Sequence, residues 1–390
     1  MHKAILRLTE HYDEWLLDSL GKIDNTISVN IGIAQGYSLL KNYEKANLFI
    51  LKWLGIYKDI DAQYNLRQQL ICNYSNMGLA AEAIEHIDIN KELLYDYELK
   101  TLEVWCYSLL RHPKAYSLNV SLLNEPLSLS QRVETEYRMN NCECIEDFHT
   151  RMKYLMAKQH IPNHYKWLTP LKEILVGETV VLYSAGGIGD EILHLRWLKW
   201  FSDRGMNVIW LPTHECVKTL VEQMGYTAAD ELFELSGHIV NCFHIPYIFN
   251  LNYDEIWTGP YLTPSLEAIS KFADCRGIGV RTSGNIDFKY DHLRMVELSD
   301  MSEHLSGELY SLHDDKVISG LIDKSGELVS LDDTMGLIHN MDYVVTTCTS
   351  VAHLSCAMGK KTYVYNKVPW FSWFKHNGKM VWYGENCEVV

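Results

Sequence analysis

Apolar positions recur at helical spacing over the first third of the chain, from about residue 28 to residue 140. Side chains three and four residues apart lie on one face of a helix, so this spacing is typical of helices that pack against one another. The segment has few prolines and lacks the short alternating runs between turn residues that indicate strands. The pattern predicts an all-helical domain, which we place at residues 1–160.

A weak internal repeat lies within this helical region. Tyr37 and Ala46 are followed by Tyr74 and Ala83, each 37 residues later, and Ala115 follows Ala83 after 32 residues. Each copy reads as two helices with a small residue where they cross, and the copies resemble degenerate tetratricopeptide repeats, whose period is about 34 residues. Such a domain either presents a concave face to a partner or to part of an acceptor, or caps its neighbour.

Two short patterns in this region are superficially like metal sites. Residues 59–61 read DID, which copies the DxD motif of some sugar transferases, but they lie within the helical region rather than at a strand end. We interpret them as solvated surface. Cys142, Glu143 and Cys144 form a cluster with His149, but the spacing fits no standard four-ligand pattern. We therefore expect no metal at either place.

The pattern changes at residues 160–178, where two prolines precede the strand-like run ETVVLYS. After this point, buried strand-like runs alternate with helical segments, and a second such series begins at Arg276. Alternation of this kind is typical of βαβ units and a parallel sheet. We predict two Rossmann-like domains, at residues 161–270 and 271–390, with a ligand cleft between the carboxyl ends of their strands.

Composition and charge narrow the class of protein. The 390 residues are 47% hydrophobic and 22% charged, as in ordinary globular proteins, and the net charge of −15 argues against binding nucleic acid or anionic lipid through overall charge. No run approaches the roughly 18 to 20 apolar residues that span a bilayer, and the first residues carry charges where a signal peptide is apolar. Ten scattered cysteines indicate mostly reduced, buried thiols. We expect a cytoplasmic protein without a membrane span.

A glycine-rich loop, residues 185–191 (AGGIGDE), follows the first predicted strand and leads at once into a helix. It lacks the third glycine of a dinucleotide fingerprint, and Asp190 and Glu191 would repel a phosphate at the helix N-terminus. Glycines permit a tight turn and close approach of a substrate, so the loop can hold Asp190 out as a proton acceptor. Alternatively, Asp190 only caps its helix.

A second group of candidate residues lies in MDYVVTTCTSVAHLSCAMGKKTYVY, which reads as strand, polar loop, helix and strand. Thr349 and Ser350 fall at the helix start, where hydroxyls and free N–H groups can bind a diphosphate and the helix dipole favours negative charge. His353 lies one turn further on. It either points into the same cleft or packs inside the domain.

At these residues the chain resembles the heptosyltransferase-like GT-B glycosyltransferases (glycosyltransferase family 9-like), in the form with tetratricopeptide repeats ahead of the transferase. Residues 187–191 (GIGDE) match the family's GxGD loop, Gly284 and Asn285 match its GN loop, and residues 291–294 (DHLR) match part of its DRxR element. Residues 331–334 (LDDT) resemble a helix start of the family. The clearest match is TSVAHL at 349–354, followed by Gly359. The resemblance covers about residues 178–385.

The resemblance implies a GT-B fold of two Rossmann-like domains, acceptor domain first and nucleotide-sugar donor domain second. It further implies metal-independent, inverting transfer of a hexose, heptose or pentose from a nucleotide sugar to an acceptor hydroxyl, with no cofactor. Asp190 is then the candidate base, and Arg294 is a diphosphate partner because a guanidinium matches phosphate oxygens. The implied donor-binding residues are Gly187, Gly189, Ser283, Asn285, Arg294, Thr349, Ser350 and His353.

The chain departs from the family at Cys348, where the family usually has aspartate. The donor therefore need not be a heptose. Cys348 also suggests a Cys/His nucleophile with His353, although their spacing does not by itself align a thiol and an imidazole. It equally supports a non-catalytic binding protein in which the helical repeats act and the transferase half has decayed. A dinucleotide-dependent oxidoreductase would need a complete glycine pattern and an acidic residue after the second strand.

The acceptor stays open among a glycan, a protein side chain and a hydroxymethylated DNA base of phage type. A basic, aromatic stretch near the C-terminus is the one feature that suits DNA, because it could stack on bases. It comprises Lys367, Trp370, Phe371, Trp373, Phe374, Lys375 and Lys379. We favour a packed terminal segment that crosses back between the two α/β domains.

Overall fold

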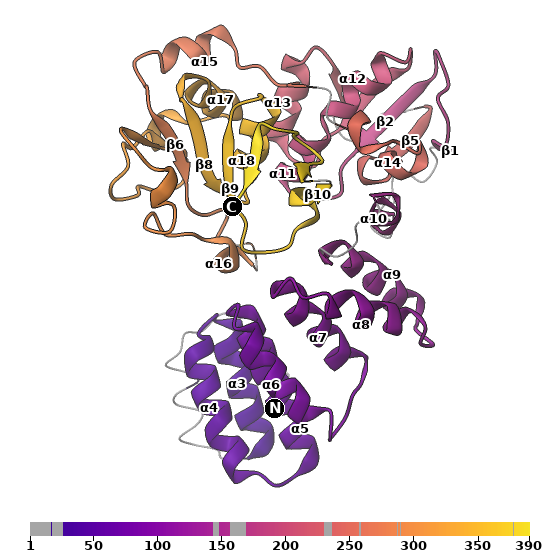
Figure 1. Cartoon of the computed structure of the whole chain (residues 1–390), viewed down its shortest axis with the longest axis vertical. Coiled ribbons are helices and arrows are strands. Elements are labelled where there is room, and N and C mark those ends of the chain that lie inside the picture. The colour runs from indigo at the N-terminus through magenta and orange to yellow at the C-terminus, as the bar shows by residue number, and fades with distance from the viewer. Residues whose placement is uncertain are drawn as a thin grey trace. The chain divides into compact units, whose positions relative to one another are not determined.

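The computed structural model describes residues 17, 26–142, 148–156, 169–229, 236–256, 259–286, 288, 290–376 and 378–390 (Figure 1). The chain separates into two compact units, Met1–Cys144 and Ile145–Val390. This boundary precedes residue 160 because α10 (Phe148–Leu155) packs on α14 (Ile245–Ile248) and on the 3-10 helix η3 (Cys242–His244), all within the second unit.

The described part of the first unit is helical, as predicted. Successive helices pack in pairs, α3 with α4, α5 with α6 and α7 with α8, and each pair also contacts the next. The repeated alanines Ala46, Ala83 and Ala115 are at most 1% exposed, which is consistent with small residues at the helix crossings. The helices are α3 (Ile27–Leu39), α4 (Tyr43–Ile56), α5 (Ile60–Asn76), α6 (Ala80–Asn90), α7 (Tyr97–Leu109), α8 (Lys114–Leu123) and α9 (Leu129–Arg138).

The same type of turn connects the two helices of each of the three pairs. After the first helix, one residue adopts a left-handed conformation, with φ of 60° at Lys41, 79° at Gly78 and 52° at Arg111. The two N–H groups at the end of each turn donate to the carbonyls of a Tyr-Ser pair in the preceding helix, which is the pattern of a Schellman cap. The pairs are Tyr37 and Ser38, Tyr74 and Ser75, and Tyr107 and Ser108. The sequence repeat therefore also encodes the turn.

The structure describes the first of the two metal-like patterns of this region in full and the second only in part. Asp59 is the N-cap of α5, exposed, and accepts a hydrogen bond from the Ala62 N–H at 2.9 Å, so the interpretation as surface is confirmed. Glu143 and Cys144 lie outside the described residues. The nine cysteines that the structure describes are free thiols, and seven of them are buried.

The second unit begins its α/β part with a five-stranded parallel sheet of order β1-β5-β2-β3-β4. The strands are β1 (Thr169–Pro170), β2 (Thr179–Tyr183), β3 (Asn207–Leu211), β4 (Thr227–Ala228) and β5 (His238–Asn241). The helices α11 (Ile188–His194), α12 (Arg196–Ser202) and α13 (Glu215–Gln223) connect them (Figure 1). Four of the five residues of β2 are buried, as the apolar run predicts.

A second five-stranded parallel sheet follows, with order β12-β9-β8-β6-β7. Its strands are β6 (Ile278–Arg281), β7 (Leu309–Ser311), β8 (Tyr343–Thr347), β9 (Thr362–Tyr365) and β12 (Cys387–Val389), and its helices include α15 (Leu266–Lys271), α16 (Asp291–Arg294), α17 (Leu331–Asn340) and α18 (Ser350–Ala357). The chain leaves β6 toward β7 and returns on the other side at β8. The β6/β8 pair is therefore the topological switch point, where open parallel sheets bind ligands.

The C-terminal segment packs on the part of the second unit that contains the first sheet. The Arg196 guanidinium donates to the Trp382 carbonyl at 2.5 Å, and the Phe374 ring lies against Phe148. Trp373 and Phe374 are 4% and 8% exposed. The interpretation of the basic, aromatic stretch as a packed segment is thus confirmed.

The prediction of a mixed α/β chain with parallel sheets behind a helical region is also confirmed. Within the described ranges, no helix is both long and apolar enough to cross a membrane.

Candidate functional site

The loop after β2 is shaped by Asp190. Gly187 is the N-cap of α11, and the Oδ2 atom of Asp190 accepts the Gly187 N–H at 2.9 Å. None of Gly186, Gly187 and Gly189 has a positive φ, so this loop turns without the left-handed conformation that favours glycine. A Cβ atom on Gly186 would lie 2.1 Å from Asp190 Oδ2, whereas one on Gly187 would meet open space. The carboxylate thus folds back over the loop and caps its helix.

Gly189 brings the two predicted motifs together. A Cβ atom there would lie 2.6 Å from the Cδ2 atom of His353 and 3.5 Å from the Cα atom of Ser350. Helix α11 of the first sheet therefore packs tightly on α18 of the second, and any side chain at position 189 would push the two helices apart. The GxGD-like loop and the TSVAH-like helix start lie side by side.

Arg294 connects the loop after β6 to the loop after β8. Its Nε donates to Asp291 Oδ1 at 2.6 Å, and a terminal nitrogen donates to the Cys348 carbonyl at 2.9 Å. Asp291 also accepts the Gly284 N–H at 3.0 Å. A Cβ atom on Gly284 would lie 2.0 Å from the guanidinium, so a side chain there would displace Arg294 from its present contacts. The GN-like and DRxR-like matches thus form one structure beside the switch point.

Two cations that the sequence did not single out lie at the same edge. Lys316 Nζ donates to Ser283 Oγ at 2.5 Å, and Arg281 Nε donates to the Ser283 carbonyl at 3.0 Å. Arg281 also forms an ion pair with Asp314 at 2.8 Å. Asn285 is exposed in the same loop. Lys316 follows β7, far from Ser283 along the sequence, and only the parallel pairing of β6 with β7 brings the two together. Arg281 is the last residue of β6 and belongs to no motif that the sequence showed.

The start of α18 combines buried and accessible groups. Thr349 is its N-cap and is 5% exposed, while Ser350 is half-buried. The Thr349 side chain makes no capping hydrogen bond, so it does not satisfy the first N–H groups of the helix. The N-terminus of α18 therefore keeps the polarity that favours an anion.

His353 is packed rather than presented to a ligand. It is 4% exposed, its Nδ1 lies 2.7 Å from the Tyr383 hydroxyl, and its ring stacks on Trp373 with centroids 4.6 Å apart. Burial lowers the pKa of His353 to about 3, and the charges of Arg196 and Arg294 add to the effect. Of the two roles left open by the sequence, the structure favours a neutral packing residue.

Cys348 is not a nucleophile paired with His353. Its Sγ accepts the Trp373 indole N–H at 2.9 Å, and His353 Nδ1 is directed to Tyr383 instead. Burial raises the pKa of Cys348 to about 11, against the opposing effects of Trp373 and Arg294. A buried, neutral thiol is inert, so the Cys/His hypothesis fails on geometry and on charge.

Glu191, which the sequence suggested only as a second acid at the helix start, is buried beside Asp190. Glu191 is 0% exposed and accepts hydrogen bonds from the Trp210 indole N–H at 3.3 Å and the Thr213 N–H at 3.0 Å. Its other oxygen is hydrogen-bonded to His214 Nδ1. Burial raises the pKa of Glu191, although the His214 contact lowers it. The sequence signal was weak, since Asp-Glu at a helix start is ordinary capping chemistry.

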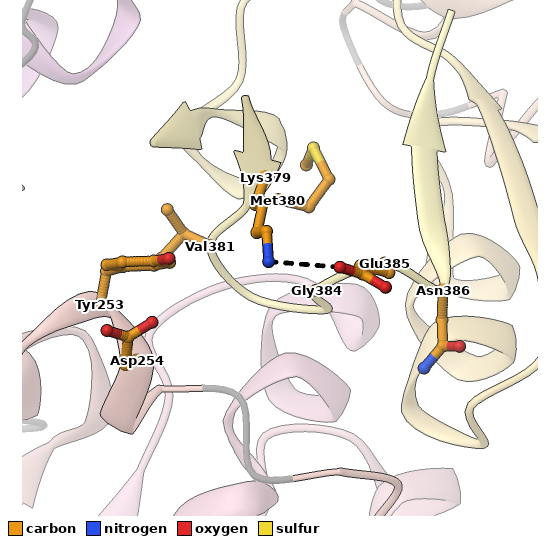
Figure 2. A pocket seen from close by; sticks show the side chains of 8 residues that line it. All are labelled: Tyr253, Asp254, Lys379, Met380, Val381, Gly384, Glu385 and Asn386. Carbon is orange, nitrogen blue, oxygen red and sulfur yellow. Dashed lines mark ion pairs between the residues drawn. The ribbon is translucent and has the colours of Figure 1, made fainter. Parts of the chain in front are cut away.

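Two pockets of the second unit lie away from the predicted site residues. A pocket of about 390 Å³ lies between Tyr253 and Asp254 on one side and residues 379–386 on the other (Figure 2). Across its mouth, Lys379 and Glu385 form an ion pair at 3.2 Å. A pocket of about 360 Å³ is lined by α12, α13 and residues 260–263. The predicted site residues line neither of them, and they form a cluster of loops at two sheet edges instead.

Metal ligands are not grouped in the part of the chain that the structure describes: no set of three or more His, Cys, Asp or Glu side chains is placed to hold an ion there.

Comparisons with known proteins give little to set beside this geometry. No protein-family model and no curated protein matches the chain. Two crystal structures of full-length LpoA from Haemophilus influenzae align with it, at 8% and 7% identity and TM-scores of 0.24 and 0.26. The alignments cover 90% and 93% of this chain and 77% of each LpoA chain. Similarity at this level does not establish a shared fold.

Proposed function

We propose that the chain is a metal-independent, inverting glycosyltransferase of GT-B architecture, preceded by tetratricopeptide-like repeats. One observation carries the proposal. Gly189 packs against Ser350 and His353, and Arg294 binds the Cys348 carbonyl, so motifs from four separate segments meet at the carboxyl ends of β2, β6 and β8. That is where two tandem parallel sheets of this kind bind and join two substrates.

The second sheet supplies the donor side. Transfer needs stabilisation of a nucleoside diphosphate as it gains negative charge. The N-terminus of α18 with Ser350, the guanidinium of Arg294, and Lys316 beside Ser283 offer that stabilisation without a metal. Asp190, the base that the family resemblance implies, lies in the first turn of α11 on the other sheet.

The acceptor class is narrowed by the C-terminal segment. Its aromatic side chains Trp373 and Phe374 are buried, so they offer no stacking surface for bases. Together with a net charge of −15, this favours a glycan or protein hydroxyl over DNA. The helical repeats are the part of the chain that we assign to holding the acceptor or a partner.

A thermal-shift and turnover experiment tests the proposal. The full chain is incubated with UDP, GDP, ADP and dTDP, then with a glucose or mannose conjugate of each, and nucleoside diphosphate release is measured with and without EDTA. We expect one nucleotide to stabilise the chain, by about 2.7 kcal/mol at a hundred times its Kd, and release that EDTA leaves unchanged. Absence of both stabilisation and release with every nucleotide would contradict the proposal.

A non-catalytic binding protein is the second candidate. It is favoured by how the polar groups are used: the Asp190 carboxylate caps α11, Arg294 is bonded to Asp291 and Cys348, and Thr349 and His353 are buried. This candidate predicts nucleotide stabilisation without turnover, or neither. The same experiment therefore separates the two.

A further inference from the structure

The proposed transfer requires a proton acceptor at the edge of the first sheet, and the structure offers an alternative to Asp190. Asp190 Oδ2 is engaged with the Gly187 N–H, and the side chain fills the space over Gly186. A capping carboxylate is held back toward its own loop. The adjacent residue, Glu191, takes part in a different arrangement that contains an imidazole.

Glu191 positions the ring of His214. The carboxylate is fully buried, and its Oε1 is hydrogen-bonded to His214 Nδ1, while Oε2 accepts the N–H groups of Trp210 and Thr213. A carboxylate buried without partners would be costly, and these three donors compensate it. An ionised carboxylate only accepts hydrogen bonds, so with Glu191 ionised the contact requires a proton on Nδ1, and Nε2 of the neutral ring then has the free lone pair.

The His214 imidazole is partly exposed, whereas the Glu191 carboxylate is buried. The His214 side chain is 35% exposed, against 0% for Glu191. Strand β3 ends at Leu211, and His214 is the N-cap residue of α13 shortly after it. Because β2 and β3 are neighbouring parallel strands, His214 lies at the same carboxyl edge of the sheet as the loop that contains Asp190. With Nδ1 bonded to Glu191, the Nε2 edge of the ring is the part that a ligand can reach.

Helix α13, which begins after His214, contacts the half of the unit that holds the proposed donor side. His214 is the N-cap of α13, and α13 packs on α17 of the second sheet's half. In that half, Asp314 of the loop after β7 pairs with Arg281, which bonds the Ser283 carbonyl. The segment that begins with His214 therefore lies against the half that contains Ser283 and Lys316.

We infer that His214, positioned by Glu191, is the general base of the proposed sugar transfer. The inference rests on the proposed function and deepens it. The acceptor O–H gives its proton to His214 Nε2 as the oxygen lone pair forms the bond to the anomeric carbon. The bond from that carbon to the diphosphate oxygen breaks, and its electron pair leaves with the nucleoside diphosphate. Glu191 stabilises the resulting imidazolium, which then releases the proton to solvent.

Five variants test this assignment with water as the acceptor and the nucleotide sugar that the wild type hydrolyses best among the UDP, GDP, ADP and dTDP conjugates. His214→Gln is expected to lose about 10²- to 10⁴-fold in kcat with nucleoside diphosphate binding retained. Glu191→Gln lowers kcat in the same direction because an amide favours the wrong tautomer. Asp190→Asn distinguishes the two candidate bases: it keeps an oxygen that can accept the Gly187 N–H, and we expect it to lose less than about tenfold, whereas a loss as large as that of His214→Gln would assign the base to Asp190.

The matched control is His238→Gln. His238 is the first residue of β5, so it lies at the amino ends of the parallel strands, away from the carboxyl ends where His214 lies, and its replacement leaves kcat unchanged. Imidazole added to a His214→Gly variant restores turnover, which a purely structural role would not allow. A His214→Gln variant with near normal kcat, or a His214→Gly variant that imidazole fails to rescue, overturns the assignment while wild-type turnover keeps the proposed function. A wild type that binds and hydrolyses none of the conjugates overturns both.

Discussion

The loops after β2 and β8 follow the same backbone plan with opposite chemistry. Each leaves the carboxyl end of a buried parallel strand and enters a helix, α11 or α18, within a few residues. The first contains two carboxylates, Asp190 and Glu191, whereas the second contains hydroxyls and has the Arg294 guanidinium on its carbonyl. The two loops therefore suit the two ends of a transfer reaction: the first contains the carboxylate that positions the proposed base His214, and the second offers groups that hold an anion.

The largest expected effect comes from separating the two loops. Gly189→Val places side-chain carbons where His353 and Ser350 now lie, at 2.6 and 3.5 Å from the Cβ position. We expect a stability loss of about 1 to 3 kcal/mol and, because the reacting groups move apart, a loss of about 100-fold or more in kcat. Thermal melts and nucleotide-sugar hydrolysis measure these quantities.

Gly326→Val is the matched control for this change. A Cβ atom at Gly326 would meet nothing within 4 Å, so the same substitution there leaves kcat and the melting temperature close to wild type. If Gly189→Val behaves like Gly326→Val, the contact between the two loops has no role in function.

The anion-holding loop is tested by Arg294→Gln. The variant removes a cation that bonds the Cys348 carbonyl beside α18, so the affinity for the stabilising nucleoside diphosphate falls by about 10- to 100-fold. Arg204→Gln is the control, because it removes the same charge from the half that contains the first sheet, where Arg204 stacks on Trp200. We expect it to leave the affinity for the nucleoside diphosphate unchanged. Titration calorimetry measures both. Equal affinities in the two variants would remove Arg294 from the donor site.

The smallest effect is a pH dependence of stability at the contact of the loops. His353 has its pKa lowered to about 3 by burial, whereas an imidazole in the unfolded chain titrates near about 6.5. Between these values the unfolded chain binds more protons, so the free energy of unfolding falls as the pH falls, by at most about 1.4 kcal/mol per pH unit for this proton. His313, whose pKa burial lowers to about 4, adds to the slope.

Unfolding by urea at several pH values between 4 and 7 measures this slope. His353→Gln is expected to flatten it, while replacement of the exposed His339 by Gln leaves it unchanged. A slope that is the same in all three proteins would show that His353 is not neutral and buried as described. The slope, rather than the stability at one pH, is the informative quantity, because the substitution also loses packing.

The sequence identified some residues of the candidate site and missed others. Gly187, Gly189 and Asp190 were found because glycines and acids at a strand-to-helix junction leave a local pattern, and the same holds for Thr349 and Ser350. Lys316 and His214 were missed because each meets its partner only through pairing of strands that are separate in sequence. Arg281 was missed because it lies within a strand, and its distant partner Asp314 is not evident from the sequence. The glycines were predicted to permit a tight turn and close approach of a substrate, and in the structure Gly189 and Gly284 permit close approach of His353 and Arg294.

The sequence alone determined the helical first region with its repeated Tyr-Ser turns, the alternation that gives two parallel sheets, and the junctions where polar loops follow buried strands. These are consequences of local periodicity and turn chemistry, which depend on near neighbours along the chain. The tertiary structure decided which polar groups are consumed internally and which stay accessible. Asp190 caps, Glu191 is buried against His214, and His353 packs on Trp373, because burial and charge at each position depend on distant segments that meet only in the folded chain.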